Sequence, residues 1–437
     1  MTVSLDLAGI GIGPFNLSLA AQLDSIDGLE LGFFERKSRF DWHPGMMLPG
    51  VELQTSFLKD LVTATNPTSP WSFVAYLVAH KRFYEFLNAD FEAVPRREFA
   101  RYLAWVAENL PTLSFDREVR EIDFDGRSFT LSFDNEQRLA RNLSLGIGLV
   151  PHIPAWAAPV PGSAVFHSSE AAHRLDRTPG RRIAVVGGGQ SGAEIMLHLL
   201  TNAAAGTEIT WISRRPNFQP LDDTPFTNEL FAPPYVERFH TLAEPRRRAT
   251  VARQKLAGDG ISGSTLRSVY RRLYELRHLA TEGTRASLLP HRDVLDLTRE
   301  GDDIQLVMRN GFDGGIEMFN ADMLVLATGY RFALPECLSP LKDRLSLDES
   351  GLPRLAADFS AQWDGPTDRR IFALNAGRFS HGIAEPQLSL MAWRSAVIAN
   401  ALVGRRHFDL EQPREPLVEW ATDDICAFVA DASNLRA

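Results

Sequence analysis

The spacing of apolar and polar residues predicts the same strand–helix–strand unit twice along the chain. The first unit has strands at Leu5–Gly9 and Leu29–Glu35 around a helix at Asn16–Leu23. The second has its strand, helix and strand at Arg182–Val186, Ser191–Leu200 and Glu208–Ser213. Strands that are connected through a helix lie parallel in one sheet. The pattern therefore predicts an α/β fold with two Rossmann-like dinucleotide-binding domains.

Other elements are predicted between and after these units. Apolar residues at helical spacing predict a helix at Pro95–Leu110, because proline is favoured at a helix start. Alternating residues on both sides of Asp125-Gly126 predict a hairpin. The remaining predictions are strands at Leu143–Ile147, Met323–Ala327 and Arg370–Asn375, a meander near Ile304–Phe319 and a closing helix at Pro386–Ala401.

The chain has 437 residues, which is enough for two or three domains. The proline-rich stretch Pro151–Pro161 is predicted to link them. We expect a first nucleotide-binding domain from residues 1–160 and 330–437, and a second from 161–230 and 285–329. The polar segment between them, residues 231–284, has a helical pattern and is predicted to be a smaller, substrate-binding insertion.

The first unit carries Gly11-Ile12-Gly13-Pro14-Phe15-Asn16 at its strand-to-helix turn. Gly11 and Gly13 permit a tight turn and let backbone N–H groups approach a pyrophosphate. Asn16 stands where a third glycine is usual, and we expect it to pack less tightly. Glu35 follows Gly13 by 22 residues, at a strand end where an acid accepts hydrogen bonds from a ribose. A glycine-rich turn followed by a solvated charge would give the same pattern without a cofactor.

The second unit matches the dinucleotide fingerprint in full, with Gly187, Gly189 and Gly192. At the end of its second strand, Arg214-Arg215 replaces the usual acid. Guanidinium groups pair with a 2′-phosphate that a carboxylate would repel, so NADPH is predicted here rather than NADH. Arg214 is nearer to the strand and is the preferred partner, although either arginine could be a surface charge. Two fingerprints together predict hydride transfer from a nicotinamide to a flavin.

Composition limits the other kinds of partner. The net charge of −9 and the pI near 5.7 argue against nucleic acid or an anionic membrane. Cys337 and Cys426 lack the spacing of a redox pair and fit a cytoplasmic location. Asp6 and Pro14 interrupt the apolar N-terminus, which argues against a signal peptide or a membrane span. The histidines form no pattern typical of a metal site, and no metal is expected.

A series of further motifs extends over the whole chain. They are Gly11-Ile-Gly-Pro-Phe-Asn-Leu-Ser18, Trp42-His-Pro-Gly-Met46, Gln54-Thr-Ser-Phe-Leu-Lys-Asp60, Val185-Val-Gly-Gly-Gly-Gln-Ser-Gly192, Asp222-Asp-Thr-Pro-Phe-Thr-Asn-Glu229, Asp322 through Ala327-Thr-Gly-Tyr330 to Pro335, and His381-Gly-Ile-Ala-Glu-Pro-Gln-Leu-Ser389. This ordered set resembles the flavin-dependent N-hydroxylating monooxygenases of siderophore biosynthesis. The run Ser389-Leu-Met-Ala-Trp-Arg-Ser395 is most similar to their lysine and diamine branch.

The resemblance implies FAD at the first fingerprint, NADPH at the second and molecular oxygen as co-substrate. It also implies a C4a-hydroperoxyflavin that hydroxylates a primary amine, and a homotetramer. Gln54, Lys59 and Asn228 are expected to serve the reaction, the last two at the substrate together with Asp259 and Ser389. The expected cofactor contacts outside the two glycine runs and Glu35 are Trp42, His43, Met46, Gln54, Gln190, Ser191, Arg214, Thr328, Gly329, Tyr330, Pro386 and Leu388. A helix beginning near Pro386 would point its N-terminal N–H groups at the flavin.

The predicted substrate is a diamine, cadaverine or putrescine, with L-lysine as the alternative. Lys59 could pair with the carboxylate of an amino acid, which favours L-lysine, or could be a surface cation. Asn228 suits either substrate, or could cap a helix after Pro225. Asp259 is a possible partner for an ammonium group, although the glycines around it are also typical of a turn. The similarity of Asp222–Glu229 to diamine enzymes favours cadaverine or putrescine, with a hydroxamate siderophore as the destination.

Three other functions share part of the pattern. A disulfide reductase needs a close cysteine pair. A Baeyer–Villiger or sulfur-oxidising flavin monooxygenase usually carries a Phe-Gly-His-Trp type signature, and Phe166-His167-Ser168-Ser169 stands there instead. A non-catalytic flavin-binding sensor or assembly protein would keep the fold without turnover. We therefore predict an FAD- and NADPH-dependent monooxygenase that hydroxylates a terminal primary amine.

Overall fold

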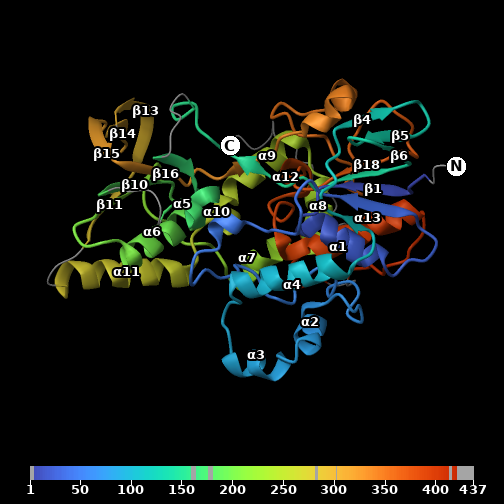
Figure 1. The fold of residues 1–437 in the computed structure, drawn as a ribbon, viewed down its shortest axis with the longest axis horizontal. Helices are drawn as coiled ribbons and strands as arrows, with labels where there is room; N and C mark the ends of the chain where they lie inside the picture. Colours follow the sequence, from blue (N-terminus) through green and yellow to red (C-terminus); the bar gives the residue numbers. More distant parts are fainter. Residues whose placement is uncertain are drawn as a thin grey trace, which may run out of the picture.

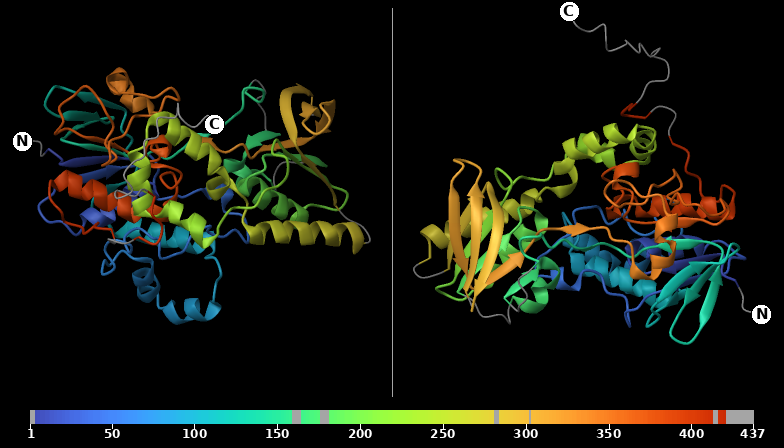
Figure 2. Two further views of the ribbon diagram at one scale, coloured as in Figure 1. Left: turned by 180° about the vertical axis from the view of Figure 1, so that it is seen from behind. Right: turned by 90° about the horizontal axis from the view of Figure 1, so that it is seen from above.

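A computed structural model describes residues 4–158, 164–175, 181–280, 284–301, 303–412 and 416–420. Cys426 and residues 159–161 of the predicted linker lie outside them. The described chain forms two lobes, each built around a five-stranded sheet (Figure 1). The first strands of the chain and the last helix of the described residues share one lobe, and much of the middle of the chain builds the other (Figure 2). The predicted α/β fold with two Rossmann-like sheets is confirmed.

The first lobe contains a sheet of order β18-β7-β1-β2-β3, in which every neighbouring pair is parallel. Its strands are β1 (Leu7–Ile10), β2 (Leu31–Phe34), β3 (Leu113–Ser114), β7 (Leu143–Leu145) and β18 (Ile371–Ala373). The first predicted strand–helix–strand unit supplies the centre of this sheet. The edge strand β18 comes from far along the chain, after the whole second sheet.

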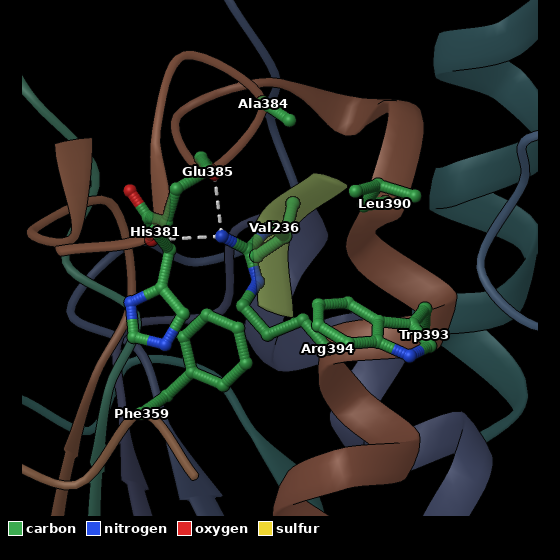
Figure 3. A pocket seen from close by; sticks show the side chains of 8 residues that line it. All are labelled: Val236, Phe359, His381, Ala384, Glu385, Leu390, Trp393 and Arg394. Carbon is green, nitrogen blue, oxygen red and sulfur yellow. Dashed lines mark hydrogen bonds and ion pairs between the residues drawn. The ribbon is translucent and has the colours of Figure 1, made fainter. Parts of the chain in front are cut away.

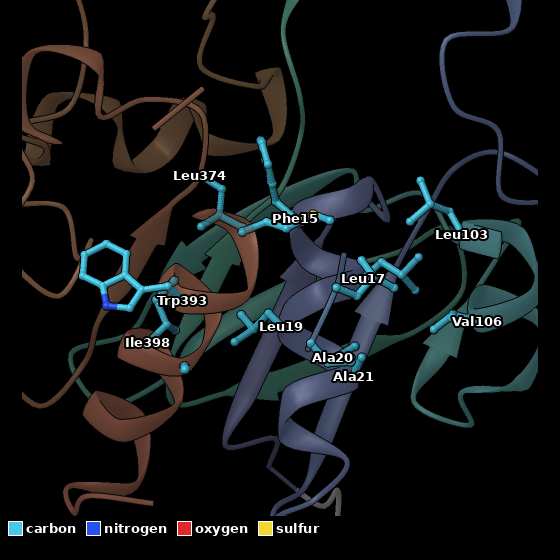
Figure 4. Close-up of a cluster of buried hydrophobic side chains, with 14 of the residues drawn as sticks. Phe15, Leu17, Leu19, Ala20, Ala21, Leu103, Val106, Leu374, Trp393 and Ile398 are labelled. Atoms are coloured by element: carbon cyan, nitrogen blue, oxygen red, sulfur yellow. The ribbon is translucent and has the colours of Figure 1, made fainter. Parts of the chain in front are cut away.

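Helices cover one face of this sheet and antiparallel strands cover the other. The helices are α1 (Pro14–Leu23), α4 (Arg96–Asn109) and α13 (Met391–Val403), whose apolar side chains meet in one core (Figure 4). Every residue from Phe15 to Leu23 is buried, and each buried leucine stabilises the fold by about 1.5–3 kcal/mol. The other face carries β4 (Glu121–Phe124), β5 (Phe129–Ser132), β6 (Gln137–Ala140) and the 3-10 helix η4 (Glu336–Arg344). The predicted helix after Pro95 and the predicted hairpin are both confirmed.

The second lobe repeats this plan. Its parallel sheet has the order β12-β11-β10-β16-β9, with β9 (Val165–His167), β10 (Arg182–Val186), β11 (Glu208–Ser213), β12 (Arg285–Pro290) and β16 (Met323–Leu326). One face carries α6 (Gln190–Asn202), and the other faces the antiparallel strands β13 (Arg292–Glu300), β14 (Asp303–Asn310) and β15 (Ile316–Ala321). The hydrophobic pattern does not predict β9, β12 or β13. Strand β9 is short, and β12 is a partly exposed edge strand without strict alternation.

Two antiparallel crossings join the lobes. Strand β8 (Val150–Pro151) leads into the second lobe and pairs with β17 (Tyr330–Arg331), which leads back. Beside this pair, Thr328 Oγ1 donates to the carbonyl oxygen of His152, and the His152 N–H donates to that of Gly329, at 2.5 and 2.9 Å. Thr328-Gly329-Tyr330 therefore lies in the connection between the lobes.

The segment predicted as a helical insertion is helical in its described residues. It contains α8 (Pro233–His240), α9 (Glu244–Arg253), α10 (Lys255–Asp259) and α11 (Gly263–His278). Helices α8 and α9 contact α12 (Arg378–His381) of the first lobe, whereas α11 contacts α6 of the second. The segment thus spans both lobes. Within the part of the chain that the structure describes, no helix combines the length and apolarity needed to cross a bilayer.

The closing helix does not begin at Pro386, as the sequence pattern suggests. The stretch before it is occupied by turns, in which the Glu385 N–H donates to the Gly382 carbonyl and the Gln387 N–H to that of Ala384. Gln387 then has an extended backbone, with φ −108° and ψ 160°. A short 3-10 helix, η5 (Leu388–Leu390), follows, and α13 begins only at Met391. Two further helices without a sequence prediction, α2 (Phe73–Ala79) and α3 (Phe83–Ala89), project from the first lobe (Figure 1).

Candidate active site

The first fingerprint forms the turn between β1 and α1. Gly11 has φ +80°, and a Cβ atom there would lie 2.9 Å from the carbonyl oxygen of Gly146, so only glycine fits. The Glu35 carboxylate accepts a hydrogen bond from the Ile12 N–H at 2.9 Å. This contact holds Glu35 beside the glycine turn with lone pairs to spare, in keeping with a ribose hydroxyl as a further partner. Pro14 occupies the first turn of α1, as the motif predicts.

Asn16 packs tightly rather than loosely, contrary to expectation. Its side chain is fully buried, and its Nδ2 donates to the carbonyl oxygen of Gly11 at 2.8 Å. The neighbouring residue Gly146 makes room for it, since a Cβ atom on Gly146 would lie 2.4 Å from Asn16 Cγ. Gly146, on the facing chain segment, therefore permits the close packing that a third glycine in the fingerprint usually permits.

The second fingerprint forms the turn between β10 and α6. At Gly187, φ is +138°, and a Cβ atom would lie 2.0 Å from the Ala327 carbonyl oxygen. The two predicted arginines differ in environment. Arg214 is exposed, and its guanidinium group has no hydrogen-bond or ion-pair partner among the described residues. Arg215 is half-buried and donates from Nη1 to the carbonyl oxygen of Asp259 at 2.9 Å. Burial lowers the pKa of Arg215, while Asp259 opposes that shift.

Gln54 of the first lobe meets Gln190 of the second fingerprint. Gln54 Nε2 donates to Gln190 Oε1 at 3.3 Å and to Ser262 Oγ at 3.2 Å. Gln190 Oε1 also accepts from the Ser262 N–H, at 2.8 Å. The structure therefore brings together a residue expected at the flavin and one expected at NADPH, from positions that are far apart in sequence.

Helix α10 lies between the second fingerprint and the chain that leads into α13. Gln387 Nε2 donates to the Gly258 carbonyl oxygen at 3.5 Å, between the predicted cofactor contacts Pro386 and Leu388. The carboxylate of Asp259 pairs with Arg378 at 3.4 Å. A substrate ammonium group would have to share Asp259 with this arginine. The structure thus gives the Asp259 carboxylate a partner of its own.

Lys59 and Asn228 take part in none of these contacts. Lys59 is half-buried, burial lowers its pKa, and its ammonium group has no hydrogen-bond or ion-pair partner among the described residues. Asn228 is exposed at the end of α7 (Pro225–Asn228) and donates to the Asp223 carbonyl oxygen at 3.4 Å. Thr224, not Asn228, caps this helix, since its side chain accepts from the Thr227 N–H. Asn228 is the N-cap residue of the following 3-10 helix η3 (Glu229–Phe231), but its side chain makes no capping hydrogen bond there.

Aromatic residues of the first lobe gather beside the connection between the lobes. Trp42 packs edge-on against Phe99 of α4 and beside His43, with ring centroids 6.0 and 5.5 Å apart. The ring of His43 also lies 6.0 Å from that of Tyr330. Met46, at the end of the same motif, is buried. These contacts give the Trp42–Met46 motif a position at the junction of the lobes, beside the chain that returns from the second fingerprint.

A buried ion pair lies behind the start of α13 and was not anticipated from the sequence. Arg394 Nη1 donates to Glu385 Oε1 at 2.8 Å, and Glu385 also accepts from the backbone N–H groups of Asn375 and Gly377 (Figure 3). The guanidinium group lies 4.0 Å from the ring centroid of Phe15, inside the first fingerprint. In the sequence, the pair is indicated only by an acid in the His381–Ser389 motif and a base in the Ser389–Ser395 run.

The small cavity beside this ion pair is not a substrate pocket. Its volume is about 10 Å³, roughly the space of one water molecule. Its lining residues are Val236, Phe359, His381, Ala384, Glu385, Leu390, Trp393 and Arg394 (Figure 3). Ser389 lies next to it, buried, and its Oγ has no hydrogen-bond partner among the described residues.

These features can be compared with known proteins. The profile of the L-lysine 6-monooxygenase/L-ornithine 5-monooxygenase family matches residues 3–332. The chain belongs to this family. It is an N-hydroxylating flavin monooxygenase of siderophore biosynthesis, and it uses FAD, NADPH and molecular oxygen. The predicted class of enzyme and its cofactors are thereby confirmed, and the rival classes are set aside.

Individual relatives act on different amines. L-lysine N6-monooxygenase of Escherichia coli is 43% identical over 96% of this chain and 99% of its own length. Putrescine N-hydroxylase of Acinetobacter baumannii is 32% identical, over 93% and 92%. The FAD-bound cadaverine monooxygenase of the desferrioxamine pathway from Erwinia amylovora superposes with a TM-score of 0.90 at 29% identity, over 96% and 100%. The comparisons leave the amine unresolved.

The residues present fit both nucleotides. Each fingerprint leaves a turn in which a side chain would collide with backbone, and each turn opens a helix whose first N–H groups are free for a phosphate. Glu35 is held beside the first turn and Arg214 is exposed at the end of β11. These positions agree with the ribose of FAD and the 2′-phosphate of NADPH.

Proposed function

We propose that this enzyme hydroxylates the side-chain amine of L-lysine. The observation that carries the proposal is the half-buried Lys59 ammonium group, for which the described residues provide no partner. Leaving a cation partly desolvated and unpaired is unfavourable unless a ligand supplies the opposite charge. The α-carboxylate of an amino acid supplies it, whereas both ends of a diamine are cationic at neutral pH.

The nearest acid in sequence does not offset Lys59. Asp60 is buried, and its carboxylate accepts hydrogen bonds from the N–H groups of Val62, Thr63 and Phe73 and from Thr63 Oγ1. These four contacts fold the loop and use the lone pairs of the carboxylate. The similarity to the lysine enzyme, which extends over nearly the whole chain, points the same way.

A diamine remains the second candidate. The structural similarity to the cadaverine monooxygenase favours it, as does the resemblance of Asp222–Glu229 to diamine enzymes. A diamine would need an acid at its distal end. Asp259 is the candidate, and it would have to exchange its pairing with Arg378 for the substrate ammonium group.

When bound, reduced FAD and molecular oxygen would supply the electrophilic oxygen that the amine attacks. The residues of this chain would bind the substrate and exclude water. Lys59 would hold the carboxylate, and Asn228 would contribute a neutral polar contact. The amine must lose its proton to act as a nucleophile, and a desolvated pocket lowers its pKa without a dedicated base. Exclusion of water also protects the activated oxygen from release as hydrogen peroxide.

The proposal is tested by measuring hydroxylamine and hydrogen peroxide with purified, FAD-loaded protein and NADPH. L-lysine, L-ornithine, putrescine and cadaverine are compared in parallel. We expect L-lysine to give the largest kcat/KM and the smallest share of peroxide. A larger kcat/KM with cadaverine or putrescine would replace the proposal by the second candidate. NADPH oxidation that yields only peroxide with all four amines would reject both.

A further inference from the structure

Arg96 and Glu194 form an ion pair that joins the two lobes. Arg96 is the first residue of α4 in the first lobe, and Glu194 lies on α6 in the second. The pair is bidentate, with Nη2 to Oε1 at 2.7 Å and Nη1 to Oε2 at 3.1 Å. Only 14% and 4% of the two side chains are exposed. A fork-to-fork pair of this kind fixes geometry as well as charge.

On the first lobe, Arg96 holds the segment that leads to Gln54. Its Nη1 also donates to the Met46 carbonyl oxygen at 3.2 Å, and its Nη2 to that of Glu52 at 3.3 Å. The Arg96 N–H donates to the carbonyl oxygen of Val51 at 3.0 Å. The side chain and backbone N–H of Arg96 therefore fix the position of the segment between the Trp42–Met46 motif and Gln54.

On the second lobe, Glu194 holds Gln190. The two residues lie one helical turn apart on the same face of α6, and Gln190 Nε2 donates to Glu194 Oε1 at 3.0 Å. With its amide group oriented in this way, Gln190 presents Oε1 to Gln54 Nε2 and to the Ser262 N–H. Gln190 also contacts Thr265 Oγ1 at 3.2 Å, at the start of α11.

We propose that the Arg96–Glu194 pair is a positioning device that sets Gln54 and Gln190 relative to each other across the junction of the lobes. The contacts form a closed circuit, from Arg96 through Glu194 and Gln190 to Gln54 and back along the chain to Glu52. The pair thereby determines how NADP(H) at the second fingerprint is presented to the flavin at the first. This inference rests on the proposed roles of Gln54 and Gln190, but it does not depend on which amine is the substrate.

A pair that serves only stability would behave differently. Replacing Glu194 by Gln leaves Arg96 buried without a counter-charge, and this costs stability whatever the role of the pair. Only a positioning role predicts in addition that NADP⁺ binds more weakly to protein that remains folded and loaded with FAD. The affinity for NADP⁺ is measured without turnover and therefore separates the two roles.

The test uses the FAD-loaded full chain with Glu194→Gln and, separately, Arg96→Lys. Calorimetry gives the NADP⁺ dissociation constant, and anaerobic stopped-flow absorbance gives the rate of flavin reduction by NADPH. We expect Glu194→Gln to weaken NADP⁺ binding and to slow flavin reduction by about tenfold each. Arg96→Lys keeps the charge but loses the fork, so its losses should be about threefold.

Glu317→Gln is the matched control. Glu317 forms a bidentate pair with Arg292 at 3.0 and 3.1 Å on the antiparallel strands of the second lobe, on the face of the sheet opposite α6. Its loss removes the same kind of contact and should leave NADP⁺ affinity and flavin reduction unchanged. A tenfold loss in this control as well would overturn the proposal, because the effect would then follow from a general loss of stability.

The proposal is also overturned if Glu194→Gln retains FAD together with the affinity and reduction rate of the unaltered protein. If Glu194→Gln does not fold, Arg96→Lys decides alone, with an unchanged affinity overturning the proposal and a partial loss supporting it. The proposal is contradicted as well if Glu194→Gln weakens NADP⁺ binding and Arg96→Lys does not weaken it at all. Glu194 would then act without the ion pair to Arg96. Failure of the L-lysine proposal is seen separately, as unaltered protein that binds NADP⁺ but forms no hydroxylamine from L-lysine.

Discussion

Ser144 on β7 donates a hydrogen bond of 2.6 Å to the side-chain oxygen of Asn16 on α1. The amide nitrogen of Asn16 reaches in the other direction, to the carbonyl oxygens of Gly11 and, at 3.2 Å, Ile10. All of these groups are buried or partly buried, so each partner satisfies another that would otherwise be unpaired. Asn16 therefore links the first helix to two neighbouring strands beneath the FAD fingerprint.

Restoring the usual glycine at this position should harm the protein. Asn16→Gly leaves the Ser144 hydroxyl without its acceptor, opens a cavity and places glycine inside a helix. We expect the free energy of unfolding to fall by about 3 kcal/mol. Urea unfolding of the FAD-loaded protein, followed by tryptophan fluorescence, measures the change. Ser144→Ala, which removes one of the contacts, should cost about 1 kcal/mol. An Asn16→Gly protein as stable as the original would show that these bonds do not support the fingerprint.

Replacing Lys59 by methionine should affect the two candidate substrates in opposite directions. If Lys59 binds a carboxylate, Lys59→Met raises KM for L-lysine by about tenfold or more, with a smaller effect on kcat. KM for cadaverine should fall, because a repelling cation has been removed. Steady-state hydroxylamine formation with both amines measures this. The exposed Lys342 on η4 offers the control Lys342→Met, which should change neither KM. Equal KM values for L-lysine before and after Lys59→Met would remove Lys59 from the site.

Replacing each of the two arginines after β11 should affect KM for NADPH and KM for NADH differently. Arg214 is exposed and available to a 2′-phosphate, so Arg214→Gln should raise KM for NADPH by about 10- to 100-fold and leave KM for NADH unchanged. Arg215 holds the Asp259 carbonyl oxygen instead, so Arg215→Gln should raise KM for both cofactors through a displaced α10. Initial rates of flavin reduction with each cofactor provide the comparison. The reverse assignment follows if Arg215→Gln alone abolishes the preference for NADPH.

His381 should make the fold less stable in mild acid. Burial, together with His240 and Arg394, holds the pKa of His381 well below its ordinary value of 6.5. Below pH 6.5 the unfolded chain takes up a proton that the folded protein refuses, so stability is greatest above this pH and declines as the pH falls. One proton contributes a slope of at most about 1.4 kcal/mol per pH unit.

His381→Phe keeps an aromatic ring against Phe359, which stacks on His381 at 4.0 Å, and removes the titrating group. Urea unfolding between pH 5 and pH 7 should then show a shallower decline than in the unaltered protein. Burial also lowers the pKa of His240 and His167, which accounts for a remaining slope. The surface variant His407→Gln should retain the full slope. An unchanged slope in His381→Phe would show that this histidine does not set the acid sensitivity.

Local features of this chain were predictable and long-range ones were not. Both fingerprints, the parallel units and the hairpin depend on short patterns, in which turn residues and periodicity act over a few positions. Strand β9 is held in place by pairing with β16, which lies far along the chain, and no local pattern reports such a partner. The start of α13 was misplaced for a related reason, since Glu385 is held in its turn by Arg394 and by two backbone groups before α12.

The candidate site shows the same division. The sequence singles out Gln54 and Gln190 separately, and their contact depends on how the two lobes meet. Arg96 and Glu194 lie 98 positions apart on helices of different lobes, and a sequence offers no reason to pair them. A charged residue on an amphipathic helix usually faces solvent, and only the junction between the lobes turns this pair inward. The pairing of Arg394 with Glu385 could not be predicted from the sequence for the same reason.

The position of β18 at the edge of the first sheet affects how the protein is made. Strand β7 has no partner on that side until residues 371–373 have left the ribosome, and α1 lacks its covering helix α13 for longer still. The lobe that contains β1 is thus completed only after the second lobe has been made. Throughout translation of the second lobe, the nascent chain exposes an open strand edge and an apolar helix face, which are the features that chaperones bind and that promote aggregation. Shortened forms that end before β18 should accordingly be recovered as insoluble protein.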